Sequence, residues 1–322
     1  MNDANVQQEM RFCEMLELVA AGARGLLPKT EVKNWSEVLH LAREHNVVSL
    51  LACALLHTSE DYCPKEIRDY LLDVVRSTSS VNVLKRQRIF HLLHELENAK
   101  IDVKLLKGYA VSHYYAHPES RDSVDTDIWI LEEQEQKVYG YFENRGFQVF
   151  ERSLTSHHGV CQSKRFGKIE IHTNLYDEIV EDVWFGALGD DKFVMEPFER
   201  VIVADGEYTT LGATDQLLFL TLHMIKHFIE GGLSIRMMLD VALHYTKRRD
   251  DIDFDRYWSA LQELHYADML NTVLWILIEY GGFEECLFPG IGVKDHEQIG
   301  LLINDLVTNW WLYGGKRASG TI

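Results

Sequence analysis

The hydrophobic pattern of this chain changes near Ile101, and this change constrains the fold more than any other feature. Residues 5–100 repeat apolar side chains at helical spacing. From Ile101 onwards, short apolar or alternating runs follow one another, separated by helical or turn segments. The runs are IDVKLL, VDTDIWIL, FQVFER and a hairpin over residues 157–176 with its turn near Phe166-Gly167. Strands that alternate with helices predict a small mixed sheet.

The pattern becomes helical again after residue 212. Long segments such as TDQLLFLTLHMIKHFIEGG have apolar residues at helical spacing, and glycine pairs separate these segments. We therefore expect an α+β protein with three regions, for which a chain of 322 residues is long enough. They are an N-terminal helical region at residues 1–100, an α/β core at residues 101–212 and a C-terminal helical region at residues 213–322.

The charge balance argues against some classes of function. The formal net charge is −18, whereas binding to nucleic acid relies on clustered Lys and Arg side chains. We therefore do not expect nucleic acid to be a partner. The five cysteines are scattered and form no C-x-x-C pair, which is typical of reduced thiols in a cytoplasmic protein. We expect a cytoplasmic protein without a membrane partner, because the N-terminus lacks a signal-peptide pattern and no apolar stretch approaches roughly 18 residues.

Two carboxylates stand two residues apart in the second predicted strand. Because side chains alternate across a strand, Asp125 and Asp127 are expected to point to the same side. A cation between them would relieve their repulsion, and Mg²⁺ prefers such oxygen ligands together with phosphate oxygens of a substrate. The alternative is a D-x-D that ends a strand or lies in a solvated loop.

A third acid occurs in the later run KIEIH. Alternation places Ile169 and Ile171 on one face of this strand and Glu170 and His172 on the other. If the two strands are neighbours, three carboxylates make a site for two metal ions plausible. The alternative is a half-exposed strand with one polar side.

Candidate phosphate-binding residues surround the first strand and precede the second. Lys107-Gly108 lies where a strand gives way to a helix, so the glycine permits close approach of a phosphate to the backbone and the lysine adds a positive charge. Arg121 precedes the aspartates and can bind a phosphate through two donors. With His172 these residues form the predicted nucleotide-binding set. The alternatives are a simple turn at Lys107-Gly108 and an ion pair between Arg121 and a nearby acid such as Asp122.

The ordered set LLKGYAVSHYY, RDSVDTDIWI and IEIH resembles the uncharacterised nucleotidyltransferase families of the DNA polymerase β-like superfamily. Their pattern is a glycine motif at a helix start, a D-x-D and a third acid on a later strand. The resemblance extends to the helical blocks on both sides, up to about residue 250. It implies Asp125 and Asp127 as metal ligands, Glu170 as the third carboxylate, and Lys107 and Gly108 at the phosphates.

Two positions depart from the superfamily pattern. Lys-Gly-Tyr stands where the superfamily usually has Gly-Gly or Gly-Ser, so the contacts of this segment with a triphosphate are expected to differ from those of the superfamily. Glu170 stands where the third acid is often Asp, and its longer side chain changes the spacing available to a metal ion.

The resemblance implies a transferase that uses Mg²⁺ or Mn²⁺. It would move a nucleoside monophosphate from a nucleoside triphosphate to an acceptor hydroxyl on a small molecule, a sugar or a protein, with release of pyrophosphate. One alternative is a nucleotidyltransferase-like toxin of a toxin–antitoxin pair, which shares an Arg before the D-x-D. Another is a non-catalytic interaction scaffold.

A second candidate metal site lies in the C-terminal helical region. His223 and His227 are four residues apart on a predicted helix and therefore share one face. The sequence has no H-E-x-x-H pattern at this point and no further Cys or His nearby. We expect these histidines to be packed side chains, or to line a substrate cleft, rather than to bind zinc.

Overall fold

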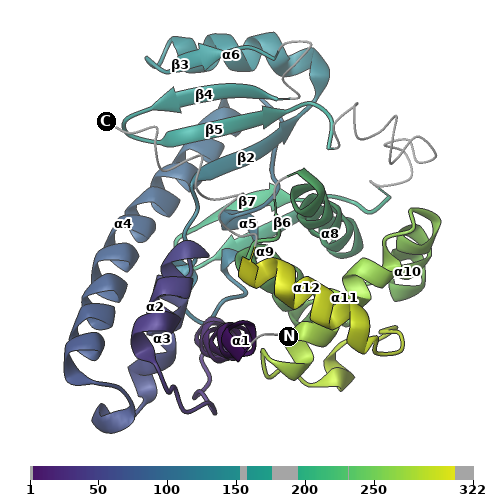
Figure 1. Cartoon of the computed structure of the whole chain (residues 1–322). Coiled ribbons are helices and arrows are strands. Elements are labelled where there is room, and N and C mark those ends of the chain that lie inside the picture. Colours follow the sequence, from purple (N-terminus) through teal and green to yellow (C-terminus); the bar gives the residue numbers. More distant parts are fainter. Residues whose placement is uncertain (1–2, 153–157, 176–194, 231, 309–322) are drawn as a thin grey trace. The chain divides into compact units, whose positions relative to one another are not determined.

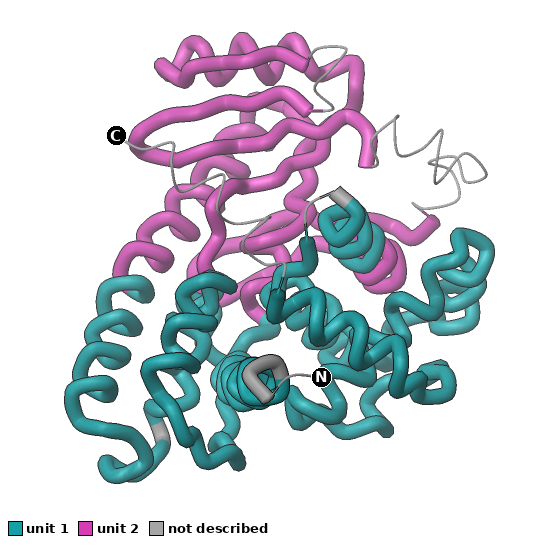
Figure 2. The backbone as a smooth tube through the Cα atoms, in the orientation of Figure 1, with its two compact units in different colours: residues 1–79, 114–121, 220–322 teal, residues 80–113, 122–219 magenta. Residues whose placement is uncertain are grey.

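The computed structural model of the chain describes residues 3–152, 158–175, 195–230 and 232–308. Two compact units make up the chain (Figure 2). Unit 1 comprises residues 1–79, 114–121 and 220–322, and unit 2 comprises residues 80–113 and 122–219. The boundary between the units falls inside two helices, α4 and α8, so each of these helices contributes residues to both units.

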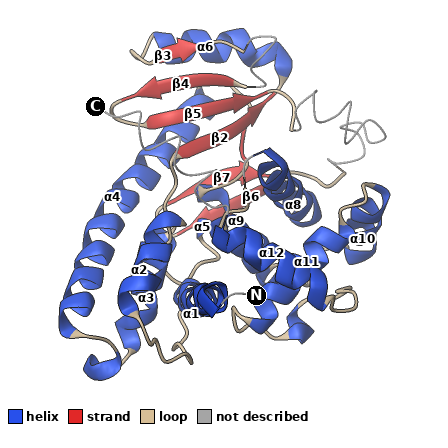
Figure 3. Ribbon diagram, in the orientation of Figure 1, coloured by secondary structure: helices blue, strands red, loops and turns tan. Residues whose placement is uncertain are grey.

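Unit 2 contains the strands of the described residues, which form one sheet of five strands and one of two (Figure 3). The strands are β1 (Val103–Leu105), β2 (Asp125–Ile130), β3 (Gln148–Phe150), β4 (Gly159–Ser163), β5 (Gly167–His172), β6 (Glu199–Val203) and β7 (Gly206–Thr210). The larger sheet has the order β1-β2-β5-β4-β3 and is mixed, because β2 and β5 run parallel while its other pairs are antiparallel. Strands β6 and β7 form an antiparallel hairpin.

Helices cover one face of the larger sheet (Figure 1). The helical segments of unit 2 are the later part of α4 (Lys65–Asn98), α5 (Tyr109–Ser112), α6 (Glu135–Glu143) and the start of α8 (Ala213–Glu230). Apolar side chains of α4 and α6 pack against alternate residues of the strands, among them Ile128, Ile130, Ile169 and Ile171. This burial supplies the main stabilising free energy of the unit. It also fixes which strand residues point the other way.

Unit 1 is helical in its described residues. Its elements are α1 (Asp3–Arg24), α2 (Trp35–Glu44), α3 (Val48–Ala54), the first part of α4, the later part of α8, α9 (Ile235–Lys247), α10 (Phe254–Glu263), α11 (Ala267–Glu279) and α12 (His296–Thr308). Short 3₁₀ turns connect several elements of the chain. They are Leu55–His57, Glu60–Tyr62, Pro118–Ser120, Glu132–Gln134 and Glu285–Leu287. The side chain of Asn34 caps α2 by accepting a hydrogen bond from the backbone N–H of Glu37, 3.3 Å away.

The α+β class expected from the sequence is confirmed, since a mixed five-stranded sheet lies between helical segments of the chain. The division into regions 1–100, 101–212 and 213–322 stays a prediction. Residues 157 and 176, at the ends of the predicted hairpin, and residues 309–322 of the predicted C-terminal region lie outside the described residues. None of the helices in the described part of the chain combines the length and the apolar character needed to span a lipid bilayer.

The packing of α1 on α3 depends on the absence of a side chain at Gly22. A Cβ atom added there would overlap the carbonyl oxygen of Leu50 and lie 2.9 Å from the backbone nitrogen of Ala54. We expect the Gly22→Ala variant to lose about 1–3 kcal/mol of unfolding free energy, because backbone atoms of a packed helix cannot move aside. Urea denaturation followed by circular dichroism measures this loss.

The matched control is Gly300→Ala in α12. A Cβ atom at Gly300 meets no atom within 4 Å, so this variant is expected to gain up to about 1 kcal/mol from the higher helix propensity of alanine. A Gly22→Ala variant as stable as the wild-type protein would contradict the close helix contact.

Candidate active site

The parallel pairing of β2 and β5 brings the predicted acids to one place. In this register Asp127 lies opposite Glu170, Asp125 opposite Lys168, and Trp129 opposite His172. Directly paired residues point to the same face of a sheet. These six side chains therefore share the face opposite the apolar core described above.

Alternation explains why this face is polar. Ile128 on β2 and Ile169 and Ile171 on β5 are buried in the core of unit 2. The residues between them must point away from that core. The predicted arrangement of KIEIH is thus observed, with one difference. Glu170 is only 8% exposed, because other polar side chains of the same face surround it.

Asp127 is at the centre of the cluster. It is 1% exposed, and its Oδ1 atom lies 2.9 Å from Nζ of Lys107 and 3.1 Å from Nε2 of His172. Burial alone would raise the pKa of this carboxyl, but the ammonium of Lys107 and the hydrogen bond with His172 outweigh burial and lower the pKa to about 2. Asp127 is therefore ionised at neutral pH.

The chain holds Lys107 in place by fixing the backbone around it. The carbonyl oxygens of Leu105 and Leu106 accept hydrogen bonds of 2.5 Å from the side chains of Thr210 and Gln216, respectively. The next residue, Gly108, has φ 63° and ψ −103°, a conformation that favours glycine. The side chains of Thr210 and Gln216 were not among the sequence candidates, because their role depends on contacts between distant segments.

Burial and charge act in opposite directions on Lys107. Burial favours its neutral form, but the carboxylates of Asp127, Asp125 and Glu170 outweigh burial and raise its pKa above the ordinary value of 10.5. Lys107 therefore carries its charge in the cluster. The helix that follows Gly108 is α5, a single turn of four residues.

Glu170 has its own basic neighbours, two of which the sequence did not single out. Lys168 pairs with its Oε1 atom, and Nε2 of His158 lies 3.5 Å from the same oxygen. Nε2 of His172 lies 3.9 Å from Oε2. Burial lowers the pKa of His158 from its ordinary value, although the charge of Glu170 opposes that shift. The position of Lys168, two residues before Glu170 on one strand, was the signal available in the sequence.

The donor set fits a divalent metal ion. Ligand atoms of Asp127, Glu170 and His172 lie within 4.8 Å of one another, and this is the single such cluster of three or more among the described residues. Carboxylate oxygens are the ligands that Mg²⁺ and Mn²⁺ prefer, and an imidazole is an acceptable additional ligand for a transition metal. Asp125 is not part of this group, but its charge acts on both Lys107 and Asp127.

Arg121, the remaining predicted nucleotide-binding residue, belongs to unit 1. Its guanidinium donates to both carboxylate oxygens of Asp240, at 2.9 Å and 2.5 Å. The hydroxyl of Tyr115 donates to the same carboxylate at 2.7 Å. Arg121 is thus part of a buried ion pair within unit 1, and its contact with a phosphate stays a prediction.

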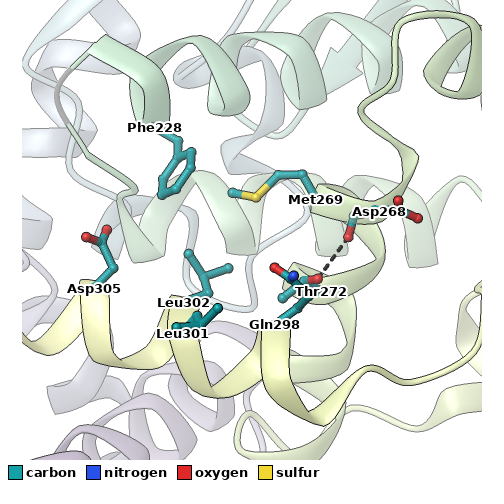
Figure 4. Close-up of a pocket in the computed structure, with 8 residues that line it drawn as sticks. All are labelled: Phe228, Asp268, Met269, Thr272, Gln298, Leu301, Leu302 and Asp305. Carbon is teal, nitrogen blue, oxygen red and sulfur yellow. Dashed lines mark hydrogen bonds between the residues drawn. The ribbon is translucent and has the colours of Figure 1, made fainter.

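Unit 1 has an open pocket of about 320 Å³ (Figure 4). Its walls come from α8, α11 and α12 and are mainly apolar. The lining residues are Phe228, Asp268, Met269, Thr272, Gln298, Leu301, Leu302 and Asp305. This pocket contains none of the predicted site residues.

The two histidines of α8 pack against each other. The rings of His223 and His227 meet edge to face, with centroids 4.5 Å apart. In the described part of the chain, no third metal-ligating side chain joins them in a cluster. Their role, as packed side chains or as part of a substrate cleft, stays a prediction.

Comparison with known proteins gives one extensive match. Residues 31–282 match a family described as uncharacterised nucleotidyltransferase. No curated protein gives a significant match.

Two solved structures are similar over about half of the chain. The first is a lincomycin-bound lincosamide antibiotic adenylyltransferase, LnuA, with 19% identity and a TM-score of 0.33 over 48% of this chain and 93% of that one. The second is an antigenic nucleotidyltransferase-like protein from Paracoccidioides brasiliensis, with 11% identity and a TM-score of 0.35 over 50% of this chain and 75% of that one.

The low pKa of Asp127 predicts a pH dependence of stability in metal-free protein. The folded-state pKa of about 2 lies below the ordinary value of 3.8, so the stabilisation is present above pH 4 and is lost as the pH falls towards 2. Between pH 6 and pH 3 the wild-type protein should lose about 1 kcal/mol relative to Asp127→Asn. Urea denaturation of both proteins in EDTA measures this difference, and a constant difference across that range would contradict the ion pair with Lys107.

Proposed function

Because the chain belongs to the family described as uncharacterised nucleotidyltransferases, we propose that it transfers a nucleoside monophosphate from a nucleoside triphosphate to an acceptor hydroxyl. Pyrophosphate is the other product. The reaction uses Mg²⁺ or Mn²⁺ and the carboxylates of Asp125, Asp127 and Glu170.

The observation that supports this proposal most directly is the register of β2 and β5. It sets Asp127 opposite Glu170, on two strands joined by a long segment of chain. Two buried carboxylates on one polar face repel each other unless cations lie between them. A site that gathers such groups is suited to divalent cations and to the phosphates they carry.

The carboxylates have separate tasks in this proposal. Asp125 and Asp127 hold the metal ions, and Glu170 completes the ligand set on the side of the acceptor. Bound there, the metal ions would supply an activated acceptor hydroxyl and neutralise charge on the triphosphate and leaving pyrophosphate. Glu170 also accepts the proton of the acceptor hydroxyl or directs it towards His172, 3.9 Å from its Oε2 atom.

Basic residues and one glycine bind the triphosphate. Lys107 and His172 already contact Asp127 and so lie where metal-bound phosphate oxygens would arrive. Gly108 adds a backbone N–H without a side chain in the way.

The acceptor belongs to one of three classes: a small molecule, a sugar or a protein side chain. The net charge of −18 makes an RNA end the least favoured acceptor, because nucleic-acid binding relies on clustered positive charge.

Binding of a metal–nucleotide complex tests the proposal without knowledge of the acceptor. We expect at least one of ATP, GTP, CTP and UTP, with Mg²⁺ or Mn²⁺, to raise the melting temperature of the wild-type protein. At a ligand concentration of about 100 times Kd the stabilisation is about 2.7 kcal/mol. Asp127→Asn should remove this increase, whereas Asp102→Asn, at an exposed carboxylate before β1, should retain it.

A screen in which no nucleotide stabilises the wild-type protein would contradict the proposed function. Circular dichroism of Asp127→Asn establishes that the variant is folded, so that a lost increase reports binding.

Transfer itself is measured with nucleoside triphosphates labelled at the α-phosphate, incubated with pools of sugars, small hydroxyl compounds and proteins. Asp125→Asn and Glu170→Gln should each reduce labelled product by about a hundredfold or more, since each removes a charge that stabilises the transition state. EDTA should abolish transfer, and added Mg²⁺ or Mn²⁺ should restore it. Transfer that persists in EDTA would exclude the metal-dependent reaction.

A further inference from the structure

Two acidic side chains of the site form ion pairs with lysines. Lys107 pairs with Asp127, and Lys168 pairs with Glu170. Each pair involves one of the two carboxylates that lie opposite each other across β2 and β5. Each lysine therefore contacts a carboxylate oxygen that could otherwise bind a metal ion.

The charges of the cluster nearly cancel. Lys107 and Lys168 face Asp125, Asp127 and Glu170, so one carboxylate charge is left over. A divalent cation that arrived alone would meet two ammonium groups next to its ligands and would gain little electrostatic energy. A cation that arrives with a triphosphate brings negative oxygens, to which the displaced ammonium groups can turn.

From these contacts, and resting on the proposed nucleotidyl transfer, we propose that Lys107 and Lys168 act as exchangeable counter-ions that make metal binding depend on nucleotide binding. Without nucleotide each lysine offsets the charge of one carboxylate. When a metal–triphosphate complex binds, they leave Asp127 and Glu170 and pair with phosphate oxygens. Free metal ions alone are therefore bound weakly.

The two side chains are suited to such an exchange. A lysine carries a compact charge on a flexible four-carbon chain, so its ammonium can move several ångströms while the backbone stays in place. The backbone next to Lys107 is fixed by the hydrogen bonds to Leu105 and Leu106, so motion is confined to the side chain. The side chain of Lys168 is 38% exposed, whereas that of Lys107 is 15% exposed. Lys168 is thus the more easily displaced of the two.

The proposal predicts a measurable coupling between two ligands. Mn²⁺ binding is titrated by electron paramagnetic resonance of the free ion, with and without the α,β-methylene analogues of ATP, GTP, CTP and UTP. In the wild-type protein at least one analogue should tighten Mn²⁺ binding by about tenfold or more, a usual size for coupling between sites. In Lys107→Met and Lys168→Met, Mn²⁺ alone should bind at least about threefold more tightly and the coupling should shrink.

Lys104→Met is the matched control. Lys104 lies opposite Trp129 on the same face of the sheet but pairs with Asp102, outside the cluster. The Lys104→Met variant should leave both the Mn²⁺ affinity and the coupling unchanged. Circular dichroism checks that each variant is folded. If Lys107→Met does not fold, Lys168→Met, at the more exposed lysine, still tests the proposal.

The outcomes separate this inference from the proposed function. Mn²⁺ that binds equally well with and without every analogue, or lysine variants that bind free Mn²⁺ no more tightly than the wild-type protein, would overturn the exchange while leaving nucleotidyl transfer possible. A wild-type protein that binds no Mn²⁺ under any condition would overturn both.

Discussion

The candidate site depends on one contact between strands, the parallel pairing of β2 and β5. A shift of this register by one residue would turn Glu170 into the apolar core and bring Ile169 or Ile171 to the polar face. Such a shift is costly, because Ile169 and Ile171 would leave the apolar core. Hydrophobic burial on one face of the sheet thus sets the positions of the carboxylates on the other. The same constraint fixes the spacing between Asp127 and Glu170.

Carboxylates gathered on one face of the sheet repel one another, and lysine and histidine side chains next to them offset this repulsion. Asp127 is almost fully buried, and an unpaired carboxylate there would be protonated or destabilising. Lys107 and His172 keep Asp127 ionised. Lys168 and His158 contact the carboxylate of Glu170. In the proposed reaction, the groups that stabilise the protein without ligands would be the groups nearest to the metal ion and the phosphates. In our proposal, the metal ion and the ion pairs that stabilise the protein compete for the same carboxylate oxygens.

Much of the fold and part of the site were predictable from local pattern. The change from helical to alternating spacing at Ile101 is a property of neighbouring residues, and it predicted the strands and the mixed sheet correctly. The same alternation placed Glu170 and His172 opposite the isoleucines of β5. Lys168 was missed although it stands in the run KIEIH, two residues before Glu170 on β5. His158 was missed because it belongs to no motif, and its contact with Glu170 joins segments that only the pairing of β4 with β5 brings together. Arg121 was singled out by its position before the D-x-D motif. Its ion pair with Asp240 was not predicted, because it joins segments far apart in the sequence.

The sequence by itself determined the order of helices and strands, the α+β class and the residue types that can bind a metal–triphosphate complex. These follow from side-chain period and chemistry, which are local. The tertiary structure decided which acids meet and which cations reach them. It set Asp127 opposite Glu170, although they are 43 residues apart in the chain, and it brought Lys107 to Asp127 through a backbone held by Thr210 and Gln216. The physical reason is that strand register and buried charge pairs depend on packing between distant segments, which no local pattern encodes.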